Sequence, residues 1–105
     1  MSIKSRAEKA AGEIGIFTEE EQKTLFLIAT LDHIIFMGEW LLKVIERDVE
    51  SSSLATKMQH ETLAKEIAQE KVELERALFF ASPKVLHARE LLVQEISKSI
   101  SSINA

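Results

Sequence analysis

The sequence contains no cysteine and very few turn-forming residues. Its 105 residues include no Cys, three Gly and one Pro. Without cysteine the chain cannot form disulfides, thiolate zinc sites or iron–sulfur clusters, and it has no cysteine nucleophile. β-Sandwiches, barrels and phosphate-binding loops need many tight turns, so this composition excludes them. Because a small secreted domain usually depends on disulfides, the sequence predicts a cytoplasmic protein.

The chain also lacks an excess of positive charge. Thirteen Lys and Arg face seventeen Asp and Glu, for a net charge of −4. Nucleic-acid binding depends on a basic surface, so we expect no nucleic-acid partner. The short motifs of metalloproteases, P-loop proteins, dinucleotide-binding proteins and serine hydrolases are absent as well. The first ten residues carry alternating charges without the apolar core of a signal peptide. The sequence therefore favours a non-enzymatic protein without excluding an enzyme.

The chain does contain long helical patterns separated by a few clear breaks. Thr18 and Glu21 have the spacing of a capping box, which predicts the start of a long helix. Ser82 followed by Pro83 predicts the start of another, because proline is favoured at the first helical position. The remaining breaks are Gly12 with Gly15, Ser51–Ser53, and a frayed end over Ser101–Ala105. We expect helices over residues 2–13, 19–49, 54–80 and 83–100.

Short connections between the three long helices predict that neighbouring helices run antiparallel. The expected fold is all-α: an antiparallel up-down bundle of three long helices plus a short N-terminal helix. We expect residues 1–105 to form a single helical-bundle domain. Gly38 interrupts the interior of the first long helix, which indicates a close approach by a neighbouring helix, a tolerated imperfection or a hinge.

The first long helix is apolar on almost all sides. One row passes over Gly38 and comprises Ile28, Leu31, Ile35, Leu42, Ile45 and Val49. A second row comprises Leu27, Ile34, Met37, Leu41 and Val44. Two covering helices leave one face of such a helix bare, and large exposed apolar patches usually mark interfaces. We therefore expect a homo-oligomer, most simply a two-fold dimer, with an interface formed by Phe26, Phe36, Met37 and Trp40. A monomer closed by the N-terminal helix is the alternative.

Residues 25–45 also have the length of a membrane span. The segment contains Asp32, His33, Glu39 and Lys43, however, and acidic residues flank it on both sides. Because central charges each cost about 2.5–3.5 kcal/mol in a bilayer, we expect a buried helix and no membrane span.

A second function, metal binding, is suggested by residues expected at the same height along neighbouring helices. With tight turns near residues 51 and 82, Asp32 and His33 lie level with Glu70 and Glu95. A carboxylate–histidine cluster inside a helix bundle is how ferritin-like proteins hold metal ions, although the Glu-x-x-His motif of those proteins is absent. The principal hypothesis is a self-associating protein that acts through protein–protein interaction, with another helical protein as a further partner. The alternative is a metal-binding bundle holding iron, manganese or zinc.

Overall fold

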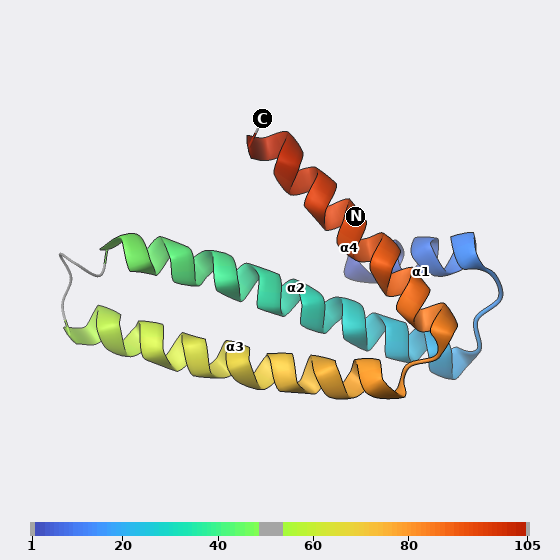
Figure 1. Cartoon of the computed structure of the whole chain (residues 1–105), viewed down its shortest axis with the longest axis horizontal. Helices are drawn as coiled ribbons and strands as arrows, with labels where there is room; N and C mark the ends of the chain where they lie inside the picture. The colour runs from blue at the N-terminus through green and yellow to red at the C-terminus, as the bar shows by residue number, and fades with distance from the viewer. Residues whose placement is uncertain (1, 49–53, 105) are drawn as a thin grey trace. The chain divides into compact units, whose positions relative to one another are not determined.

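The computed structural model describes residues 2–48 and 54–104, which form four helices (Figure 1). These are α1 (Ile3–Ile14), α2 (Glu19–Asp48), α3 (Leu54–Phe80) and α4 (Pro83–Asn104). The all-α prediction is confirmed, because α2 pairs with α3 and α1 with α4, as in an up-down bundle with a shorter N-terminal helix. The predicted break at Ser51–Ser53 and the apolar position Val49 lie outside the described residues.

The chain divides into two compact units. The terminal unit comprises Met1–Thr30 and Ala77–Ala105, and the hairpin unit comprises Leu31–Arg76. Helix α1, the first turns of α2 and helix α4 therefore belong to the terminal unit. The rest of α2 and most of α3 form the hairpin unit. The single domain expected over residues 1–105 stays a prediction.

Helix α1 is held in the terminal unit by small buried side chains. Ala7, Ala10 and Ala11 are buried on α1, which packs against α4, where Val85 and Ala88 are buried. Small residues allow two helices to approach closely, so a short helix of low hydrophobicity can still pack firmly. Helix α1 ends one residue later than predicted. Its cap is Gly15, whose φ of 152° suits glycine and whose N–H donates to the Ala11 carbonyl, while Gly12 lies inside the helix.

In the hairpin unit, α2 and α3 run side by side in opposite directions (Figure 1). Leu31 and Ile35 are buried on α2, and Ile67 and Leu74 are buried on α3. A Cβ atom at Gly38 would lie 2.8 Å from both Cγ1 and Cδ1 of Ile67. The close approach predicted at Gly38 is therefore confirmed, because no larger residue fits there without movement of Ile67.

The predicted frayed end was wrong for residues 101–104, and Ala105 lies outside the described residues. Helix α4 continues through Ser101 and Ser102 to Asn104, beyond the expected end at Ile100. Serine only weakly disfavours a helix interior, and this segment contains no glycine or proline that would end the helix.

Candidate functional site

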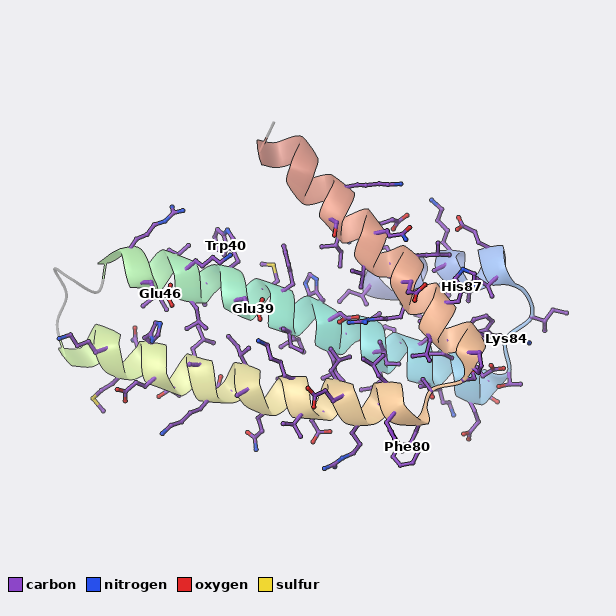
Figure 2. The ribbon with its side chains drawn as sticks, in the orientation of Figure 1. Glu39, Trp40, Glu46, Phe80, Lys84 and His87 are labelled. Atoms are coloured by element: carbon purple, nitrogen blue, oxygen red, sulfur yellow. The ribbon has the colours of Figure 1, made fainter. Side chains whose placement is uncertain are left out.

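An exposed apolar surface lies on the part of α2 that belongs to the hairpin unit. We call this surface the α2 face and define it by Ile34, Met37, Trp40 and Leu41, which are 44%, 45%, 57% and 42% exposed. Their spacing of three, four and seven residues places them on one side of the helix. Trp40 extends from the side of α2 opposite α3 (Figure 2). The surface is thus continuous over about two helical turns and carries no charged group.

The opposite side of this stretch of α2 is joined to α3 by two polar contacts. Lys71 Nζ lies 2.7 Å from Glu39 Oε1, and His60 Nε2 lies 3.2 Å from Glu46 Oε1. Figure 2 shows Glu39 and Glu46 on the side of α2 that faces α3. Both pairs are partly exposed, so each contributes little to stability. They mark the side of α2 that packs on α3, and Trp40 lies on the other side (Figure 2).

Little of the apolar stretch of α2 is buried within its own chain. Residues Glu19–Arg47 form the one helix in the described part of the chain that is long and apolar enough to cross a membrane, judged by length and composition. Only 22% of its most apolar window is buried inside the chain. The expectation of a helix buried on nearly all sides is therefore not met by a single chain.

The four residues predicted as an interface differ in their surroundings. Met37 and Trp40 belong to the α2 face, and Phe36 on the same helix is only partly exposed. Phe26 is 44% exposed but belongs to the terminal unit. The prediction did not select Ile34 and Leu41, although both belong to an apolar row that is visible in the sequence as a seven-residue spacing. Their exposure identifies them as part of the same surface.

The predicted metal ligands are not gathered into a metal centre. In residues 2–48 and 54–104, no group of three or more His, Asp or Glu side chains is arranged to hold a metal ion. Asp32, His33 and Glu70 belong to the hairpin unit, whereas Glu95 is an exposed residue of the terminal unit.

The register of α2 against α3 differs from the one assumed when these residues were predicted as ligands. Contact between Gly38 and Ile67 places Glu70 about level with Ile35 in the antiparallel pair. Asp32 therefore lies nearly one helical turn away, about 4–5 Å along the axis. The register assumed from a tight turn put Asp32 level with Glu70. The register of α2 against α3 in the structure differs from it by three residues.

No protein-family model, curated protein or solved structure matches this chain. Its function therefore has to be argued from its own residues.

Proposed function

We propose that the protein is a non-enzymatic helical protein that forms a homodimer through the α2 face and acts through protein–protein interaction. The observation that carries this proposal is the exposure of Ile34, Met37, Trp40 and Leu41 on a helix that also packs against α3. Apolar surfaces of this kind on soluble proteins usually mark interfaces. Tryptophan and methionine are also enriched in interface cores.

The energetics favour burial of these side chains against another surface. Full burial of a large apolar side chain contributes about 1.5–3 kcal/mol, so burying the exposed part of each residue contributes roughly 1 kcal/mol. Every copy of the chain carries the same face. Two copies related by a two-fold axis therefore cover each other with a single surface, which is the commonest symmetry of protein oligomers.

The charge distribution is compatible with this arrangement. Each chain has a net charge of −4, so two copies repel each other weakly at long range. The four residues of the α2 face are uncharged, and the exposed cations Lys43 and Arg47 border the face three and seven residues after Trp40. The charged groups Glu39 and Glu46 are directed toward α3 instead.

A lipid bilayer is a less suitable partner than a second copy. Helix α3 contacts α2 through Ile67, Lys71 and His60, and its other positions are rich in Lys and Glu. Insertion of α2 would either carry these charges into the bilayer or break the pairing with α3. Each charge at the bilayer centre costs about 2.5–3.5 kcal/mol.

The first experiment measures the mass of the purified chain in solution by light scattering. We expect twice the mass of one chain, and the single-chain mass for Trp40→Glu and Ile34→Glu. Val72→Glu is the matched control, because Val72 is 53% exposed on α3 and lies outside the α2 face. This control should keep the dimer mass. Circular dichroism of each variant checks that the helices are retained.

The fluorescence of Trp40 gives a second measurement on the unmodified protein. The chain has one Trp and no Tyr, so its tryptophan emission reports on Trp40 alone. We expect the emission to shift to longer wavelength on dilution as the dimer dissociates. A monomer at every concentration, or an emission shift seen only when phosphatidylcholine vesicles are added, would overturn the proposal.

A further inference from the structure

The terminal unit contains a pocket of about 740 Å³ between α1 and the first turns of α2. Helix α1 lines it with the small residues Ala7 and Ala11. Phe17, Leu25 and Phe26 form the larger apolar part of the lining. Ala7, Ala11, Phe17 and Leu25 are buried, whereas Phe26 is 44% exposed. The pocket therefore has an apolar floor built from two helices and the segment that connects them.

Two glycines make this pocket roomy. A Cβ atom added at Gly12 or at Gly15 would meet no atom within 4 Å, so both positions border open space. The segment between the helices is held in place at Phe17, whose carbonyl accepts a hydrogen bond from Gln22 Nε2 at 3.4 Å. The pocket thus lies within one compact unit, and one hydrogen bond ties the connecting segment to α2.

The rim of the pocket carries a balanced set of charges. Lys4 and Glu8 contribute from α1, and Glu19 and Lys23 contribute from α2. All four are exposed, and none has an ion-pair partner within the described part of the chain. Two positive and two negative groups favour neither an anionic nor a cationic ligand, but they offer both hydrogen-bond donors and acceptors.

The floor of the pocket has no unsatisfied polar group that a ligand would need to pair with. Among the described residues, no buried side-chain nitrogen or oxygen lacks a hydrogen-bond partner. Leu25 and Ala7, the least exposed of the lining residues, are apolar. Complementarity at the floor is therefore hydrophobic, and polar groups of a ligand are best satisfied at the rim.

We propose that this pocket binds an uncharged amphiphile of small-molecule size, with its acyl chain or ring on the apolar floor and a hydroxyl or amide head at the charged rim. The volume lies within the range of about 300–1,000 Å³ that is usual for small-ligand sites. The pocket shares no residue with the α2 face, so this inference does not rest on the proposed dimer.

The test is a titration with 1-octanol followed by two-dimensional ¹H–¹⁵N NMR spectroscopy. The chain has three glycines, whose amide signals are readily recognised. We expect the signals of Gly12 and Gly15 to shift saturably, and that of Gly38 in the hairpin unit to stay in place. Because each buried methylene strengthens binding by a factor of about four, 1-hexanol, with two fewer methylenes, should bind roughly fifteenfold more weakly than 1-octanol.

Two comparisons keep the inference falsifiable. Gly12→Leu places a side chain in the open space and should weaken octanol binding, observed at Gly15, by about tenfold or more. Glu13→Leu introduces the same side chain one residue later, outside the lining, and should leave binding unchanged. Octanoate and octylammonium should bind no more tightly than octanol. The inference is overturned by the absence of saturable shifts, by equal shifts at Gly38, by unchanged binding in Gly12→Leu, or by clearly tighter binding of either ion.

Discussion

The carboxylate of Glu21 accepts a hydrogen bond from the hydroxyl of Ser82, at 2.8 Å from its Oε2 atom. Its other oxygen, Oε1, accepts the backbone N–H of Thr18 at 3.1 Å, and Thr18 Oγ1 accepts the N–H of Glu21 in return. Ser82 Oγ also accepts the N–H of Val85 at 3.3 Å. One side chain therefore connects the capping groups of α2 and α4, which are 61 residues apart in the sequence.

Glu21→Gln should lower the stability of the protein and weaken its dependence on acidic pH. The hydrogen bond from the Thr18 backbone, followed by the one from Ser82, holds the pKa of Glu21 below its ordinary value of 4.5. A carboxyl whose pKa is lower in the folded state stabilises the protein fully above the unfolded pKa. That contribution is lost as the pH falls through the folded pKa. Melting temperatures measured from neutral pH to below pH 4.5 should show a smaller loss in the variant than in the parent.

Glu20→Gln is the matched control for this prediction. Glu20 lies beside Glu21 in the first turn of α2, so both substitutions remove one negative charge from the same helix N-terminus. The melting temperature of the Glu20→Gln control should depend on pH as that of the parent does, apart from the small effect of the lost charge. Equal pH profiles for the two variants would contradict the role assigned to the Ser82 and Thr18 contacts.

Ser82→Ala should destabilise the protein by about 1 kcal/mol, which is typical for loss of a helix N-cap. The substitution leaves the N–H of Val85 without its side-chain acceptor and removes the donor to Glu21. Chemical denaturation measures the change. In the Ser82→Ala, Glu21→Gln double variant the two effects should be less than additive, because both substitutions break the same contact. Strict additivity would show that Ser82 acts only as a cap.

Gly38→Ala should destabilise the hairpin, although alanine is the better helix former. Alanine gains about 1 kcal/mol in a helix interior, but its Cβ would overlap two atoms of the buried Ile67 side chain. Overpacking typically costs 1–3 kcal/mol, so we expect a net loss of about 1 kcal/mol in the free energy of unfolding. Chemical denaturation of the two proteins measures it.

Gly12→Ala is the opposite case and serves as the comparison. Gly12 is also within a helix, but an added Cβ meets no atom within 4 Å. This variant should be more stable than the parent by roughly 0.5–1 kcal/mol. If both substitutions changed stability in the same direction, the close contact between Gly38 and Ile67 would not control the outcome.

Local sequence signals predicted the helices well. The capping box of Thr18 and Glu21 and the cap at Ser82 act over three residues, so their geometry is set by the residues themselves. The end of a helix was predicted less well where the sequence has no residue that stops it. Residues 101–104 contain neither glycine nor proline, and the end of α4 depended on helix propensity alone.

The candidate metal site shows where sequence reasoning reached its limit. Bringing Asp32 and His33 level with Glu70 required a register between two helices, and that register was inferred from an assumed tight turn. The contact of Gly38 with Ile67 instead fixes the pairing three residues away from this expectation. A shift of three residues moves side chains nearly one turn along the axis, so the level match from which the site was inferred is not the one in the structure.

The sequence by itself determined the all-α class, the starts of the long helices and the presence of more apolar surface on α2 than its neighbours can cover. These properties follow from local backbone preferences and from the periodicity of apolar residues. Tertiary structure decided which of those apolar residues are left outward. Ile35 is 8% exposed while Trp40 is 57% exposed, although both are apolar residues of α2 in the hairpin unit. The difference arises because packing against neighbouring helices buries one side of α2, and a sequence pattern does not specify which side that is.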